Sequence, residues 1–137
     1  MFRTAGDVYR GFSRFAAVAF FLVAIYTLLV KVPGGDIRDD WSHTVLHVAT
    51  GLFAVYAGWI AAGETAAVAF AWALALGYGG LGVVGWFVDG FLMNTTLRVP
   101  LGAADNVFHL FLGAGAIVAI AVAWARTERP RAEAGLR

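Results

Sequence analysis

The sequence contains no cysteine, and it has few charged residues for its length. Without cysteine, the chain can have no disulfide framework, thiolate metal site, iron–sulfur cluster or cysteine nucleophile. Charged residues make up 14% of the 137 residues and hydrophobic residues 61%, whereas soluble domains contain roughly 25% charged and 45–50% apolar residues. This composition excludes an ordinary water-soluble domain.

A strongly basic surface is also absent. The ten Lys and Arg residues are nearly balanced by nine Asp and Glu residues, which gives a net charge of +1. Proteins that bind nucleic acid neutralise phosphates with clustered basic residues, and the basic residues here are scattered. We therefore expect no nucleic acid among the partners, and we expect the lipid bilayer instead.

Long uncharged runs fill most of the chain. They cover residues 15–30, 41–63, 65–88 and 106–125. A transmembrane helix needs roughly 20 apolar residues, and backbone polar groups in lipid must be satisfied within the segment, which favours helices. We therefore expect a single membrane domain over residues 1–137, an all-α, antiparallel bundle of four transmembrane helices at about 12–32, 42–63, 65–88 and 105–126.

Positive charge is distributed unevenly between the two sides of this expected bundle. Seven Arg residues lie near the helix ends on the side that holds both termini, whereas Lys31, Arg38 and Arg98 lie on the other side. Cytoplasmic segments of membrane proteins carry the excess of Lys and Arg. We therefore expect a multi-pass protein of the cell membrane with both termini in the cytoplasm.

The three histidines belong to a pattern that occurs twice, at the start of the second and fourth expected helices. The pattern is His or Asp, then His four residues later, then Gly after four more, at residues 43–51 and 105–113. Residues four apart share one face of a helix. We expect His47 and His109 to lie at similar depth, where their imidazoles could approach each other directly or with something between them. Ionisable residues inside a membrane are costly and usually face the bundle interior, so they indicate a functional site.

Several interpretations of these histidines remain open. In a structural one, His47 and His109 are neutral and hydrogen-bonded between helices, while Ser42 and Asp105 act as N-caps. In another, a divalent metal or copper ion is bound, because imidazole suits zinc, copper and nickel and a carboxylate can complete the shell. The ligands of that ion would be His43, His47, Asp105 and His109. Further alternatives are a haem with His47 and His109 as axial ligands, or titratable donors in a proton relay or in a quinone or lipid-headgroup pocket.

A glycine-rich run occupies residues 77–85 of the third expected helix. Gly79, Gly82 and Gly85 form a ridge without side chains. Such a ridge lets another helix approach closely, either within the chain or in a partner subunit.

Residue patterns typical of enzymes are missing. No Ser-His-Asp set, nucleophile elbow or carboxylate dyad with plausible geometry can be assembled from the sequence, so no catalytic residue is assigned. The favoured function is a non-enzymatic membrane protein that acts alone, as a homo-oligomer or as an accessory subunit of a larger membrane complex. The alternative is a metal- or haem-binding membrane protein that uses His47 and His109 for transport or redox chemistry.

The helix-start motifs resemble those of a known family. They read Trp-Ser-His-Thr-Val-Leu-His-Val-Ala-Thr-Gly at residues 41–51, Gly-Tyr-Gly-Gly-Leu-Gly at 77–82 and Ala-Asp-Asn-Val-Phe-His-Leu-Phe-Leu-Gly at 104–113. They are similar to motifs of small prokaryotic four-helix membrane proteins that are catalogued as a domain of unknown function. The resemblance covers residues 14–125, and it implies a four-helix integral membrane protein without implying an activity or cofactor. His43 departs from the family pattern, in which Asn is common at that position.

Overall fold

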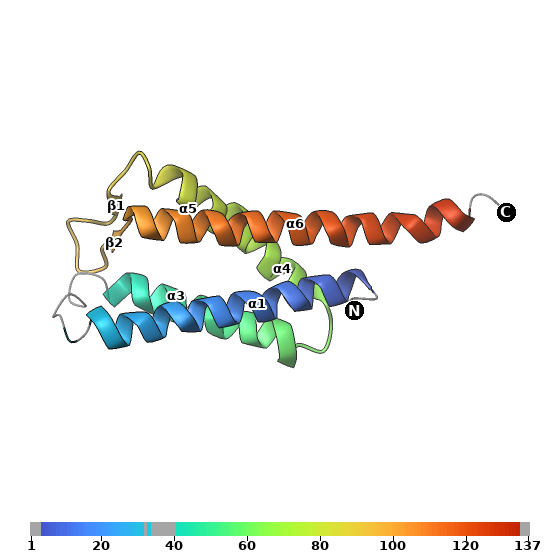
Figure 1. The fold of residues 1–137 in the computed structure, drawn as a ribbon, viewed down its shortest axis with the longest axis horizontal. Helices are drawn as coiled ribbons and strands as arrows, with labels where there is room; N and C mark the ends of the chain where they lie inside the picture. Colours follow the sequence, from blue (N-terminus) through green and yellow to red (C-terminus); the bar gives the residue numbers. More distant parts are fainter. Residues whose placement is uncertain (1–3, 32, 34–40, 135–137) are drawn as a thin grey trace.

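The computed structural model describes residues 4–31, 33 and 41–134, which form four long helical segments and a small β-hairpin (Figure 1). In chain order the elements are α1 (Ala5–Tyr26), η1 (Thr27–Lys31), α3 (Trp41–Val55), η3 (Tyr56–Ile60), α4 (Thr65–Ala73), η4 (Leu74–Tyr78), α5 (Gly79–Val84), β1 (Gly90–Phe91), β2 (Val99–Pro100) and α6 (Ala103–Ala134). The η segments are π-helical turns that continue an α-helix.

The expectation of four apolar helices is confirmed. Four helical segments are long and apolar enough to cross a membrane, and they cover Ala5–Val30, Trp41–Ile60, Thr65–Val84 and Ala103–Thr127. Their bounds differ from the expected ones mainly at three ends. The first helix begins earlier, the third ends earlier, and α6 continues past the expected residue 126 to Ala134.

The early start of α1 has a local cause. The backbone N–H of Asp7 donates to Oγ1 of Thr4 at 3.1 Å, and the N–H of Thr4 donates to Oδ2 of Asp7 at 2.9 Å. This reciprocal capping box satisfies backbone donors that otherwise lack partners at a helix start. It stabilises a turn that precedes the uncharged run.

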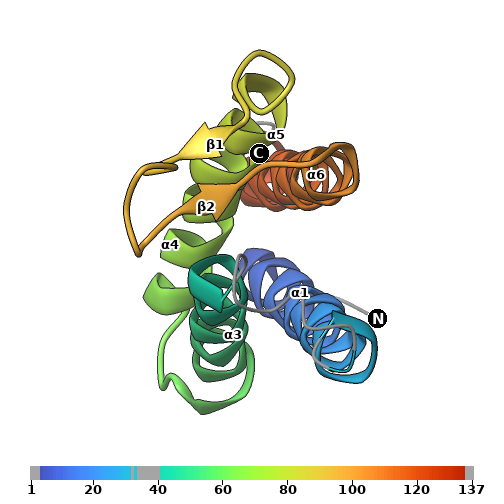
Figure 2. The same cartoon turned by 90° about the vertical axis from the view of Figure 1, so that its left-hand side faces the viewer.

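Helix α1 packs against both α3 and α6, and α6 packs against α5 and η4, as the end-on view shows (Figure 2). Residues early in α1 contact residues late in the α3–η3 segment, since Nε of Arg14 donates to the carbonyl of Gly58 at 2.9 Å. Further along α1, Phe20 lies against Gly51 of α3. The start of α1 and the end of α6 lie at the end of the fold opposite the hairpin (Figure 1).

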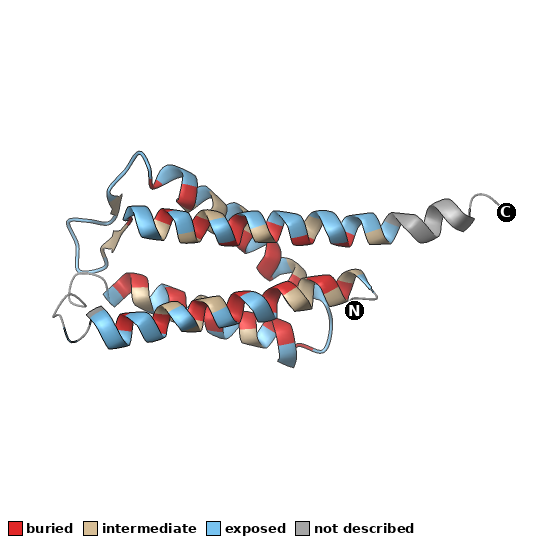
Figure 3. Cartoon of the chain, in the orientation of Figure 1, coloured by how far each residue is buried: buried red, intermediate tan, exposed pale blue. Residues whose placement is uncertain are grey.

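Buried residues line the inside of the bundle and exposed residues face outward (Figure 3). Eight alanines among the described residues are fully or almost fully buried, among them Ala16, Ala54 and Ala116. By contrast, Leu76 is 71% exposed and Phe87 is 82% exposed. Phe20, Phe70, Leu74 and Leu112 are also fully buried, but many large apolar side chains face outward, whereas water-soluble proteins bury most of theirs.

The glycine ridge of the third helix packs against α6 of the same chain. This is one of the two expected arrangements, the other being contact with a helix of a partner subunit. A Cβ atom on Gly113 would lie 2.5 Å from Cα of Gly79, and one on Gly82 would lie 2.7 Å from the backbone nitrogen of Leu110. Backbone approach this close is typical of helix interfaces rich in small residues. It places the η4–α5 segment directly beside the first turns of α6.

A short antiparallel hairpin precedes α6 and adds two strands to the expected all-α fold. Gly90 pairs with Pro100 and Phe91 with Val99. The indole N–H of Trp41 donates to the carbonyl of Thr96 at 3.2 Å. This bond attaches the hairpin loop to the start of α3, so the loop lies over one end of the bundle.

Candidate metal centre

Three histidines from two helices meet near the hairpin end of the bundle. His43 and His47 lie one turn apart on α3, and His109 lies in the second turn of α6. Each offers one ring nitrogen, and these three atoms lie within 4.8 Å of one another. The side chains are only 3%, 5% and 1% exposed, respectively, so the cluster is shielded from solvent.

The distance between His47 and His109 constrains their interaction. Their Nε2 atoms lie 3.4 Å apart, which is longer than the common range of about 2.7–3.2 Å for a protein hydrogen bond with an N–H donor. Two nitrogens bound at about 2.0–2.1 Å to one tetrahedral zinc ion are about 3.3–3.4 Å apart. The observed separation matches two ligands of one ion.

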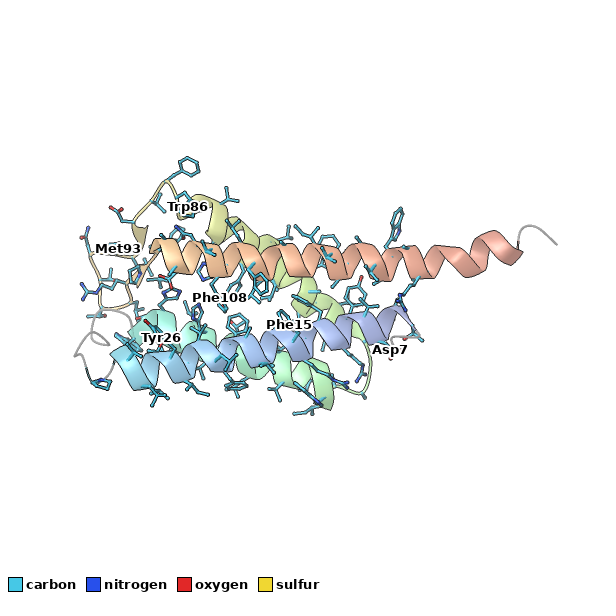
Figure 4. The ribbon with its side chains drawn as sticks, viewed as in Figure 1. Asp7, Phe15, Tyr26, Trp86, Met93 and Phe108 are labelled. Carbon is cyan, nitrogen blue, oxygen red and sulfur yellow. The ribbon has the colours of Figure 1, made fainter. Side chains whose placement is uncertain are left out.

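Aromatic rings from α1, η4 and α6 enclose the histidines. The ring centroids of Phe20 on α1 and Phe108 on α6 lie 5.6 and 5.5 Å from that of His47. Tyr78, at the end of η4, lies edge-on to His109 at 5.0 Å. Tight packing of this kind fixes the imidazole orientations and limits the access of water. Figure 4 shows Phe108 at the same end of the fold as Tyr26.

Tyr78 is held in place by a short chain of hydrogen bonds. Its hydroxyl donates to Oγ1 of Thr50 at 2.9 Å, and the Thr50 hydroxyl donates to the carbonyl of Leu46 at 2.8 Å. The π-helical turn that ends at Tyr78 changes the helical register just before this contact. Such turns occur frequently at functional sites.

Two cavities adjoin the cluster. The larger cavity has a volume of about 240 Å³ and lies between α1, α3 and α6, where Thr27, Thr44 and Asp105 contribute polar groups beside His43 and His47. The smaller cavity has a volume of about 150 Å³ and is lined by all three histidines together with Leu46, Thr50, Tyr78, Leu81 and Val99. The histidines therefore lie at the boundary between the two spaces.

Asp105 lies near the cluster but outside it. Among the described residues, the group of close ligand atoms contains the three histidines and leaves out Asp105. Its Oδ2 accepts a hydrogen bond from the backbone N–H of Gly102 at 3.0 Å. Helix α6 begins at Ala103, so Asp105 lies in its first turn and is not the N-cap residue. Its carboxylate still provides negative charge on the larger cavity.

Ser42 lies one residue after the start of α3. Its hydroxyl contacts the carbonyl of Thr96 at 3.5 Å. Ser42 is therefore not the N-cap of α3 that the structural interpretation expected. Its contact with Thr96 instead helps to attach the hairpin loop to α3.

Two buried polar atoms of α6 have no hydrogen-bond partner in the described part of the chain. They are Nδ1 of His109 and Oδ1 of Asn106. A buried polar atom without a partner costs about 1–3 kcal/mol. Such atoms are rare in folded proteins, and each needs an explanation, such as a catalytic role or a bound water or ion.

A haem does not fit between His47 and His109 in this arrangement. Axial ligands bind iron from opposite faces of a flat macrocycle, which needs a gap wider than the 3.4 Å between the two Nε2 atoms. The rings of Phe20, Phe108 and Tyr78 also lie against the imidazoles. The geometry favours a single ion.

The residues that enclose the site were not expected from the sequence. Thr27 lies within an apolar run and Tyr78 within the glycine-rich run, and neither has a charge or a ligand spacing that relates it to the histidines. Thr50 lies three residues after His47, on the same helix face, and this spacing was a usable signal.

No family model, curated protein or solved structure matches the chain.

Proposed function

We propose that the chain is an integral membrane protein, an antiparallel four-helix bundle, that binds one first-row transition-metal ion. The ligands are His43, His47 and His109. The observation that carries this proposal is the approach of three buried ring nitrogens to within 4.8 Å of one another.

Membrane insertion is supported by the distribution of side chains. The four helices present large apolar residues outward and bury alanine and glycine between them. Lipid solvates the first kind of surface, and small residues allow close packing of the second. An antiparallel arrangement is supported by the order of contacts between α1 and α3, where Arg14 meets Gly58 and Phe20 meets Gly51.

The cytoplasmic side is assigned to the end of the fold that carries the start of α1. The guanidinium of Arg10 donates there to the carbonyls of Ala61, Ala62 and Gly63 at 2.9, 3.2 and 3.0 Å. Arginine excess marks cytoplasmic segments. This orientation places the hairpin and the histidine cluster toward the opposite side of the membrane.

The native absence of cysteine allows a direct test of this orientation. Gly63→Cys and Asn94→Cys place single thiols at exposed positions at opposite ends of the fold. A membrane-impermeant maleimide should label Asn94→Cys in cells whose cytoplasmic membrane is intact, and Gly63→Cys only after permeabilisation. The opposite pattern would overturn the assigned orientation, and equal labelling of both would overturn the membrane-spanning arrangement.

The donor set identifies the class of ion. Three imidazoles without thiolate suit zinc, copper and nickel better than magnesium or calcium, which prefer oxygen ligands. Three neutral imidazoles leave the charge of a divalent ion uncompensated. The Asp105 carboxylate on the adjoining cavity supplies one negative charge close by.

Metal content of the purified protein tests the proposal. In mild detergent, the wild-type chain should retain or take up about one equivalent of zinc or copper. His47→Ala and His109→Ala should lose it, whereas Val45→Ala, on the exposed face of the same turn of α3, should keep it. A wild-type protein that binds less than half an equivalent, even after incubation with each metal, would refute metal binding. A Soret band would instead indicate haem.

A purely structural role is the second candidate, and the His47–His109 contact favours it. In that case the histidines join α3 to α6 in a non-enzymatic membrane protein, which acts alone, as a homo-oligomer or as an accessory subunit of a membrane complex. It predicts that His47→Ala and His109→Ala lower thermal stability without changing any bound species. An accessory subunit would also co-purify with specific partner proteins.

A further inference from the structure

The histidine cluster provides three donors, whereas a tetrahedral transition-metal ion has four coordination positions. We propose that the fourth position is open to a small exogenous ligand, which reaches the ion through the larger cavity between α1, α3 and α6. This inference rests on the proposed metal binding and adds the ligand class and its route.

Among the described residues, three side-chain oxygens of α6 and η4 lie against other groups. Oδ2 of Asp105 accepts from the N–H of Gly102 at 3.0 Å. The hydroxyl of Tyr78 donates to Thr50 at 2.9 Å. Oδ1 of Asn106 packs against the backbone of Gly85. Each of these oxygens would have to leave its present position to become a fourth ligand.

The larger cavity has the size and lining that a small polar ligand needs. Its volume of about 240 Å³ is several times the share of one water in the liquid, about 30 Å³. It is smaller than the pockets of about 300–1,000 Å³ that hold drug-sized molecules. Thr27, which is 3% exposed, lines it together with Asp105 and the two histidines of α3.

The charge of the site selects among small ligands. Three neutral imidazoles around a divalent ion leave a net positive centre, and a buried positive charge favours an anionic partner. Zinc with three histidine ligands and an open position binds water, hydroxide or substrate there. The ligand class is therefore a small anion or a water-derived donor of a few atoms.

Cobalt and azide provide a test in which the probe is defined. Co²⁺ replaces zinc in imidazole sites, and its visible absorption changes when a fourth ligand exchanges. The wild-type protein loaded with Co²⁺ in detergent should show a saturable spectral change on titration with sodium azide. Ala104→Phe should fill the larger cavity, because Ala104 lines it from the start of α6.

The matched control is Ala103→Phe, which adds the same ring at the preceding exposed residue, outside the lining of both cavities. Both variants should bind Co²⁺ as the wild type does. Ala104→Phe should weaken the azide response by about tenfold or more, and Ala103→Phe should leave it unchanged.

The outcomes separate this inference from the proposed function. Wild-type protein that binds no Co²⁺ overturns both. Wild-type protein that binds Co²⁺ but does not respond to azide overturns the open position alone. In that event, a changed Co²⁺ spectrum in Asp105→Asn would identify Asp105 as the fourth ligand. An azide response in Ala104→Phe equal to that of the wild type would refute the route through the larger cavity.

Discussion

Nε2 of His47 lies 3.4 Å from Nε2 of His109, although 62 positions of the sequence separate the two residues. The same interval relates the two copies of the His-x-x-x-Gly pattern. The two copies therefore bring their histidines to one level of the bundle, and His43, one turn away, joins them there. Substitutions at and around this contact separate a metal site from a structural one.

Zinc should stabilise the wild-type protein and leave His47→Ala unaffected. A ligand that binds only the folded state at 100 times its dissociation constant adds about 2.7 kcal/mol to the free energy of unfolding. Thermal unfolding in detergent, with and without zinc, measures this as a rise in Tm. Val45→Ala should show the wild-type rise. A rise of equal size in His47→Ala would mean that zinc acts elsewhere.

Asp105→Asn should weaken metal binding by about tenfold while leaving α6 stable, since loss of outer partners of a metal site commonly costs 10–100-fold in affinity. The Asn side-chain oxygen can still accept from the N–H of Gly102, so the first turn keeps its hydrogen bond. Asp105→Ala removes both the negative charge and the hydrogen bond from Gly102, so it should also lower stability by about 1 kcal/mol. Competition with a chelator measures the affinity. An unchanged metal affinity in Asp105→Asn would show that the carboxylate does not contribute to metal binding.

Gly113→Ala should destabilise the bundle, because its new Cβ would lie 2.5 Å from Cα of Gly79 and 2.8 Å from its nitrogen. Backbone atoms cannot rotate away, so α6 must move from α5, at a cost of about 1–3 kcal/mol. Gly77→Ala is the matched control, since its Cβ meets nothing within 4 Å. Thermal unfolding should distinguish the two variants. Equal stability would show that this glycine contact is not close in the folded protein.

Tyr78→Phe should retain the metal and lose about 0.5–1.5 kcal/mol of stability, because it removes the hydrogen bond to Thr50 and keeps the ring against His109. Metal content and thermal unfolding measured on the same preparation test both parts. If Tyr78→Phe lost the metal, the phenol oxygen would belong to the ligand set.

The apolar helices and the depth of two histidines followed from the sequence because both depend on local rules. An uncharged run of about 20 residues has few alternatives to a membrane helix, and the spacing of His47 and His109 within their helices sets their level. The capping box of Thr4 and Asp7 was also present in the sequence as a Thr-x-x-Asp pattern. Because this pattern lies before the uncharged run, the first helix was predicted to begin later than it does.

The enclosing residues did not follow from the sequence because their positions depend on how helices pack. Tyr78 reaches His109 through a π-helical turn, which leaves no mark in an apolar sequence. The small strands around Gly90 and Pro100 are too short for an alternating pattern. Asp105 was expected in the ligand set from its place in the repeat, and the structure turns its carboxylate toward Gly102.

The cluster takes two histidines from α3 and one from α6, which follows α3 in the sequence. A ribosome releases α3 well before α6, so the nascent chain passes through a stage at which only two of the three imidazoles exist. The third arrives when α6 packs against the glycine ridge of α5. If the site binds metal as proposed, an ion would thus find all three ligands only once the bundle has assembled.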